Sequence, residues 1–206
     1  MRGRGRELSS DARGRGDDGG VESSDSSAAP RKPKYAPAGP EPTTTPSPVP
    51  VAFDRTVPPP APEALSSPAT VDNAEVVAGY FMTLFPYIDA TRDFAEWRRL
   101  SGASCGYCAN AVELIRDDTP PPGSSSIGGE LTIHSAWGKT YRDGYYVKLQ
   151  AEEQESWRIA ADGAVLEYFR GPHIVSIEML LSHHAGGWQV DGVSVDKVAT
   201  VTSDGR

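Results

Sequence analysis

The sequence lacks any long hydrophobic run. No stretch of its 206 residues approaches the roughly 18 consecutive apolar residues of a membrane-spanning helix. The opening residues, Met-Arg-Gly-Arg-Gly-Arg, contain no apolar segment of the kind that defines a secretory signal peptide. The sequence as given therefore predicts neither a transmembrane span nor an export signal.

Basic residues are too few for a nucleic-acid surface. The chain has 20 Lys and Arg against 28 Asp and Glu, which gives a formal net charge of −8. The charges of residues 1–70 balance, so the whole acidic excess falls on the remainder of the chain. Because phosphate binding needs clustered Lys and Arg, we expect no nucleic-acid partner.

Cysteine is scarce, and both cysteines fall in one motif, Cys105-Gly-Tyr-Cys108. This spacing is used by thiol-disulfide exchange enzymes, which place it after a strand in a βαβ framework. Here helical patterns precede the motif and strand patterns follow it. We predict a structural disulfide that positions the start of a helix. A reduced, inert pair and an exchange centre are the alternatives.

Proline is unevenly distributed, with 13 of the 18 prolines in residues 1–70. That segment has too few apolar residues to offset the entropy of ordering it. Residues 1–70 are therefore predicted to be a disordered Gly/Ser/Pro-rich tether, and residues 199–206 a disordered tail. The folded domain is expected to span residues 71–198.

The first helical pattern begins near residue 71. Apolar residues recur at intervals of three and four, which predicts an amphipathic helix. Asp72 and Glu75 are spaced as in a capping box, so Asp72 is the expected N-cap. Pro86 is expected to end or kink this helix, because proline has no N–H to donate. The apolar stripe consists of Ala74, Val77, Tyr80, Phe81, Leu84 and Ile88.

Two shorter helical patterns follow, over residues 91–100 and 105–117, with Ser104 as the expected cap of the second. Residues 118–126 are expected to form a loop. From residue 131 apolar residues alternate with polar ones, which is typical of strands. These strand-like runs cover residues 131–137, 145–152, 157–159, 165–169, 174–181 and 188–195.

The last run changes phase across Gly192, which predicts a β-bulge there. The order of these patterns predicts an α+β fold. We expect three N-terminal helices followed by a curved antiparallel sheet of four to six strands.

Four segments carry a resemblance to a known family: Tyr80–Asp93, Leu100-Ser with Cys105-x-x-Cys108, Gly128-Gly-Glu130 and Gly186-Gly-Trp-Gln-Val190. Together they resemble a family of uncharacterised actinobacterial envelope proteins with an NTF2-like domain, over roughly residues 71–196. Members are typically small lipoproteins, with a lipid-modified cysteine, a Ser/Thr/Pro-rich spacer and then this domain.

The resemblance implies an NTF2-like cone, in which a bent sheet wraps around the helices, and an address in the cell envelope. An oxidising compartment there would allow the disulfide to form. The sequence as given has no lipobox cysteine, so a cytoplasmic address is expected if the chain is complete.

Fold does not decide function, because NTF2-like domains include both enzymes and binding modules. We expect a non-catalytic module on a flexible tether that binds a protein or a small apolar ligand, with a homodimer left open. The alternative is an enzyme, either a disulfide exchanger through Cys105 and Cys108 or an isomerase or cyclase with a pocket inside the cone.

Six aromatic residues could line such a pocket, although aromatic residues at these intervals also form ordinary cores. Trp137 alternates in phase with Leu131 and Ile133, whereas His134 falls on the opposite face. No catalytic set can be assigned from spacing. The candidate lining residues are Tyr80, Trp97, Trp137, Tyr145, Trp157 and Tyr168.

A zinc site would need two ligands besides the cysteines. His183 and His184 are adjacent, and neighbouring residues of a strand point to opposite faces, so they do not readily share one ion. His134 and His173 are the other histidines. We expect no metal site and no cofactor.

Overall fold

The computed structural model describes residues 53–200, with side chains as far as residue 196. The tether prediction for residues 1–52 and the tail prediction for residues 201–206 lie outside this range. A 3-10 turn, η1 (Glu63–Leu65), is followed by the helices α1 (Val71–Thr91), α2 (Ala95–Leu100) and α3 (Gly106–Asp117). The strands are β1 (Ser125–Gly128), β2 (Leu131–Tyr141), β3 (Gly144–Glu153), β4 (Ser156–Ile159), β5 (Val165–Phe169), β6 (His173–His184) and β7 (Gly187–Thr200).

Helix α1 has its cap two residues before the predicted one and runs through Pro86. The N-cap is Thr70, whose side chain accepts a hydrogen bond from the Asn73 N–H, so Asp72 lies in the first turn. A carboxylate there still interacts favourably with the positive end of the helix dipole. Pro86 is buried inside the helix, which continues to Thr91. Packing of the apolar residues on both sides of Pro86 outweighs the lost backbone hydrogen bond. None of the helices in residues 53–200 is long and apolar enough to cross a membrane.

The two shorter helices begin later than predicted. Helix α2 starts at Ala95, whose N–H donates to the Asp93 carboxylate. The N-cap of α3 is Cys105, whose Sγ accepts from the Cys108 N–H at 3.2 Å. Ser104, the predicted cap, instead donates its hydroxyl hydrogen bond to the Asp191 carbonyl oxygen on β7.

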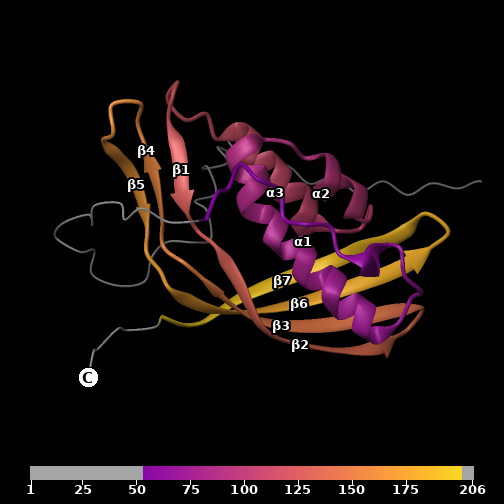
Figure 1. Cartoon of the computed structure of the whole chain (residues 1–206). Helices are drawn as coiled ribbons and strands as arrows, with labels where there is room; N and C mark the ends of the chain where they lie inside the picture. Colours follow the sequence, from indigo (N-terminus) through magenta and orange to yellow (C-terminus); the bar gives the residue numbers. More distant parts are fainter. Residues whose placement is uncertain (1–52, 201–206) are drawn as a thin grey trace, which may run out of the picture. The chain divides into compact units, whose positions relative to one another are not determined.

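Four antiparallel strands, in the order β2-β3-β6-β7, form the larger sheet, and the helices pack on one of its faces (Figure 1). We call this face, towards the helices, the inner face and the opposite one the outer face. Val147 and Leu149 on the inner face are fully buried in one core with the α1 stripe. The apolar stripe of α1 therefore packs on alternate residues of the sheet. The stripe residues in the core are Ala74, Val77, Tyr80, Phe81, Leu84 and Ile88.

Two of the bulges in the larger sheet change which side chains face inwards. In β7, Leu181 pairs with Val190 and Leu180 with Gly192, which leaves Asp191 as the extra residue. The predicted bulge is thus present next to Gly192, and it brings Val193 back to the core side. A second bulge, not predicted, places His134 as an extra residue in β2.

A smaller sheet, in the order β1-β4-β5, was not predicted as a separate unit. The single sheet of four to six strands is therefore corrected to seven strands in two sheets within the described residues. Strand β1 also falls partly in the predicted loop 118–126. The two sheets meet where Gly128 and Gly129, both at φ above +70°, lie against residues 155 and 156. A Cβ on Gly128 would lie 2.3 Å from the Glu155 carbonyl oxygen, so only glycine fits this corner.

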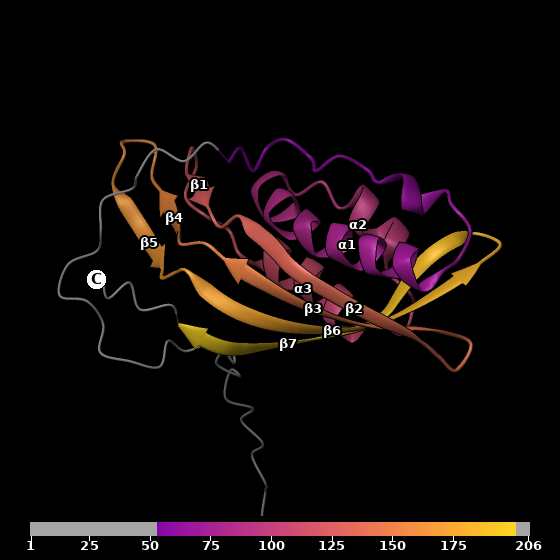
Figure 2. The same cartoon turned by 60° about the horizontal axis from the view of Figure 1, so that its bottom comes forward.

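Order within the domain begins before the predicted boundary at residue 71. Arg55 is buried, with its guanidinium 2.6 Å from the Asp89 carboxylate of α1. The Trp188 indole N–H donates to the Ala64 carbonyl oxygen at 3.0 Å. Residues 53–70 run over the helices on the side away from the larger sheet (Figure 2). They are part of the folded domain and not of the tether.

Candidate functional site

The six aromatic residues predicted to line a pocket lie in three separate places. Trp97 is fully buried and stacks on Phe81, with ring centroids 4.1 Å apart. Tyr80 and Tyr145 belong to the same core between helices and sheet. Trp157 and Tyr168 pack together in the smaller sheet, with centroids 5.6 Å apart. Trp137 lies on the outer face, so the six do not line one common pocket.

Trp137 is displaced by the bulge at His134. The alternation from Ile133 predicts that Trp137 points inwards, but the extra residue reverses the phase of β2 from Ser135 onwards. Trp137 therefore pairs with Lys148 on the outer face and is 56% exposed. His134 is exposed, as the alternation predicts, and lies 3.2 Å from the Glu152 carboxylate.

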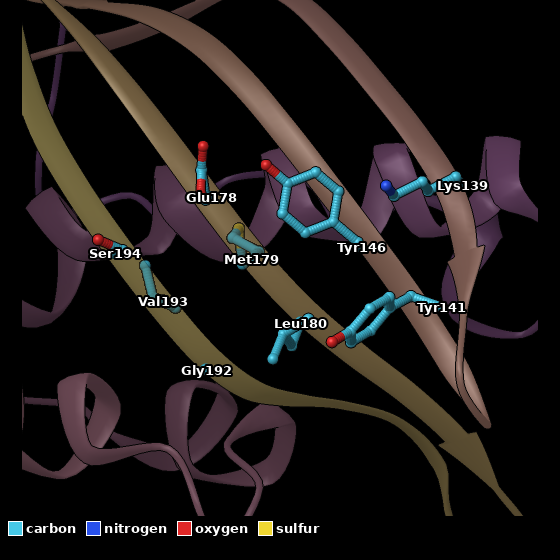
Figure 3. Close-up of a pocket in the computed structure, with 9 residues that line it drawn as sticks. All are labelled: Lys139, Tyr141, Tyr146, Glu178, Met179, Leu180, Gly192, Val193 and Ser194. Atoms are coloured by element: carbon cyan, nitrogen blue, oxygen red, sulfur yellow. The ribbon is translucent and has the colours of Figure 1, made fainter.

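A hollow of about 470 Å³ lies on the outer face, with the helices behind the sheet (Figure 3). We call it the outer groove. All four strands of the larger sheet contribute to it. Gly192 deepens it at β7, where a Cβ would meet only the Leu180 side chain within 4 Å. Its lining residues are Lys139, Tyr141, Tyr146, Glu178, Met179, Leu180, Gly192, Val193 and Ser194.

Aromatic rings and one aliphatic side chain dominate the exposed wall of the outer groove. Tyr141 is 40% exposed and Leu180 is 39% exposed. Tyr146 packs edge-on against Trp137, with ring centroids 6.2 Å apart. Together these side chains form an apolar surface open to solvent, which is typical of a binding surface rather than of a core.

The positive and negative charges at the outer groove are equal in number, and each charged side chain contacts a partner. The Lys139 ammonium lies 5.3 Å from the Tyr146 ring centroid and 5.7 Å from that of Trp137, within cation–π range. Lys148 Nζ lies 3.5 Å from the Glu178 carboxylate. The pKa of the Tyr146 hydroxyl is raised, mainly by partial burial and to a smaller extent by a hydrogen bond with Glu178. The groove therefore offers tyrosine hydroxyls and apolar surface without a net charge.

Cys105 and Cys108 form a disulfide, as predicted, with Cα atoms 5.2 Å apart. Both residues are at most 2% exposed. The Cys108 carbonyl oxygen accepts a hydrogen bond from the Trp97 indole at 3.0 Å. On the preceding turn, the Gly102 N–H donates to the Val190 carbonyl oxygen at 2.8 Å. The disulfide thus fixes the start of α3 between Trp97 and strand β7.

A cluster of ion pairs lies near the C-terminal end of α1. Beside the Arg55–Asp89 pair, Arg158 lies 2.5 Å from Asp118 and 2.8 Å from Glu167. A hollow of about 60 Å³ opens beside Asp89, Asp118 and Arg158. Since each arginine already has a carboxylate partner, the cluster ties the segment before η1 and the strands β4 and β5 to the helices.

The histidines of the described residues belong to no metal-binding cluster. His183 packs against the Trp188 ring, with centroids 5.0 Å apart, and His173 is buried. Within residues 53–200, no group of three His, Cys, Asp or Glu residues is placed to hold a metal ion.

No protein-family model matches the chain, and no curated protein matches it as a relative. Solved structures similar to it include Aln2 from a Streptomyces species (12% identity, TM-score 0.39, covering 60% of this chain and 88% of Aln2). A protein from Catenulispora acidiphila is similar at 11% identity and TM-score 0.39, covering 60% and 89% of the two chains. An uncharacterised protein with a cystatin-like fold from Caulobacter vibrioides is similar at 8% identity and TM-score 0.38, covering 63% and 88%. At these TM-scores the likenesses establish no function for this chain.

Proposed function

We propose that this chain is an NTF2-like binding module of the cell envelope, without a catalytic centre, whose binding surface is the outer groove. Its ligand is a protein or a small apolar molecule. The observation that carries the proposal is the distribution of aromatic side chains. On the inner side of the sheet Trp97 packs on Phe81 and Tyr145 packs on Trp188, while the outer groove lies on the opposite face.

The α+β architecture supports the NTF2-like assignment. Helices precede the strands, and the larger sheet carries them on one face, as the resemblance implies. The packing of the interior argues against a catalytic role, because an enzyme with this cone fold needs an open pocket with a polar group inside. Here the Tyr80 hydroxyl donates to the Glu96 carboxylate, and Trp97 fills the space next to Phe81.

The disulfide supports an oxidising address, since such bonds persist mainly outside the cytosol. Its burial argues for a structural role. An exchange enzyme must present one sulfur to its substrate, whereas Cys105 and Cys108 are enclosed by the start of α3 and its neighbours. In an insulin-reduction assay we expect no turnover, and turnover that is lost in Cys105→Ser would favour the oxidoreductase alternative.

The binding role is tested with the neutral apolar dye N-phenyl-1-naphthylamine. We expect saturable binding to the full chain, weakened several-fold in Leu180→Ser, because this change removes apolar surface from the outer groove. The matched control is Leu166→Ser on β5, since Leu166 is 41% exposed and lies outside the groove. Equal binding by both variants, or no saturable binding by the native chain, would contradict the proposal.

A further inference from the structure

A second surface of the molecule matches the outer groove in its chemistry. Residues 57–62 read Val-Pro-Pro-Pro-Ala-Pro and carry no charge. We call this segment the proline arch. Pro62 has φ −75° and ψ 152°, the values of a polyproline II helix. Val57 is 60% exposed, and Pro58, Pro60 and Ala61 are exposed as well.

Both ends of the proline arch are anchored. On one side Arg55 is held by Asp89 and by the Pro86 carbonyl oxygen, to which its Nε donates at 3.3 Å. On the other side Ala64 accepts the hydrogen bond of the Trp188 indole. An extended segment fixed at both ends loses little further conformational entropy when it binds, so the arch is a preorganised ligand.

We propose that the proline arch of one copy of this chain binds in the outer groove of a second copy. The inference rests on the proposed function, since it assigns an occupant to the same groove. Polyproline II segments have no internal hydrogen bonds and leave their carbonyl oxygens free to accept from a partner. Grooves lined by aromatic residues recognise such segments.

The lining of the outer groove fits this occupant. The rings of Tyr141 and Tyr146, with Leu180, provide surfaces for proline rings, and the Tyr141 hydroxyl can donate to a backbone carbonyl. Lys139 and Glu178 contribute one charge of each sign, and each already has a partner. A neutral segment can therefore bind in the groove without burying an unpaired charge. An acidic or basic peptide would bury a charge that has no partner in the groove.

The arch cannot reach the groove of its own copy. It is fixed over the helices, on the inner side of the larger sheet, while the groove opens on the outer side (Figures 1, 2 and 3). The contact is therefore heterologous, with a different surface from each copy. Such contacts repeat from copy to copy and build chains unless the geometry closes a ring.

The test uses the full-length chain and two variants with complementary defects. Leu180→Ser alters the groove and leaves the arch intact, and a double variant, Pro58→Ser with Pro60→Ser, alters the arch and leaves the groove intact. Sedimentation is measured from about 1 µM to about 1 mM, where weak contacts become populated. We expect the average mass of the native chain and of the Leu166→Ser control to rise with concentration, and each complementary variant to remain monomeric.

A one-to-one mixture of the two complementary variants gives the decisive measurement. Each pair has one intact arch and one intact groove, so we expect dimers and nothing larger. A mixture that stays monomeric overturns the proposal. So does an arch variant that still associates alone, because that outcome indicates face-to-face pairing of grooves. A native chain that is monomeric throughout the range also overturns it.

A peptide separates this inference from the proposed function and from any folding defect of the variants. The peptide Thr-Val-Pro-Pro-Pro-Ala-Pro, which corresponds to residues 56–62, should displace the dye from the native chain and reduce its average mass. If the dye binds but the peptide does not displace it, the arch is not the occupant and the proposed function stands. If the dye itself does not bind, the proposed function fails first.

Discussion

Tyr80 shows how one buried hydroxyl makes the stability of the domain depend on pH. Burial, and then the neighbouring Glu96 carboxylate, raises the pKa of the Tyr80 phenol to about 12. Its hydroxyl lies 3.3 Å from Glu96 Oε1. The folded state therefore keeps the phenol proton at a pH at which an exposed tyrosine has lost it.

This shift predicts a loss of stability in alkali. Above about pH 10 the unfolded chain releases the Tyr80 proton while the folded chain retains it, so the free energy of unfolding falls until about pH 12. Tyr80→Phe removes this contribution, and its unfolding free energy should fall less steeply over the same range. Urea melts at several pH values, with Tyr141→Phe as an exposed control, measure the difference. Identical slopes for Tyr80→Phe and the native chain would contradict the prediction.

At the residue scale, the sequence predicts burial well where the backbone is regular. Val147 and Leu149 fall on the core side because β3 pairs with β6 without a bulge. Trp137 fails for a local reason, since the extra residue His134 reverses the phase of β2. No alternation signal marks that bulge. The same bulge explains why the outer groove was not predicted. The alternation of Tyr146 with Val147 does place Tyr146 on the outer face, but the β2 residues after the bulge were expected on the inner face.

At the scale of elements, the apolar stripe of helix α1 is the face that the helix buries in the core. Leu84 is 1% exposed and lies in the cluster with the inner face of the sheet. Leu84→Ala should lower the free energy of unfolding by roughly 2–5 kcal/mol, because it removes apolar contacts and leaves a cavity. Val76→Ala on the same helix is the control, since Val76 is 48% exposed.

Denaturant melts of both α1 variants check this prediction. The control should change stability by less than about 1 kcal/mol, since an exposed side chain contributes little to the core. A neutral Leu84→Ala, or equal losses in the two variants, would mean that α1 does not pack on the sheet through this stripe.

The existence of the elements was easier to predict than their ends. The helical period indicates α1 and α3, but their N-caps depend on which of several nearby polar groups bonds the first free N–H. Thr70 and Cys105 do so in place of Asp72 and Ser104. Strand β1, with the sequence Ser-Ser-Ile-Gly, has too little apolar pattern to mark it. Its pairing with β4 depends on the turn at Gly128 and Gly129, which lie against residues 155 and 156, and therefore on residues distant in sequence.

At the scale of the whole domain, the segment before α1 joins parts that are far apart in sequence. Arg55 contacts the end of α1, and Ala64 contacts Trp188 at the start of β7. Deleting the segment would leave the Asp89 carboxylate and the buried Trp188 indole N–H without these partners. Buried polar groups that lose their partner are costly, whereas exposed ones are not.

Two shortened chains test whether residues 53–70 belong to the domain. A chain beginning at residue 71 should be less stable than one beginning at residue 53 by about 2–4 kcal/mol, since it loses the Arg55 ion pair and the Trp188 hydrogen bond. Urea melts of the two chains measure this difference. Limited proteolysis of the full chain should likewise leave a core that begins near residue 53. Equal stability of the two shortened chains would mean that the boundary lies elsewhere. A protected fragment that begins before about residue 50 would mean the same, because packed and hydrogen-bonded backbone resists cleavage whereas exposed backbone does not.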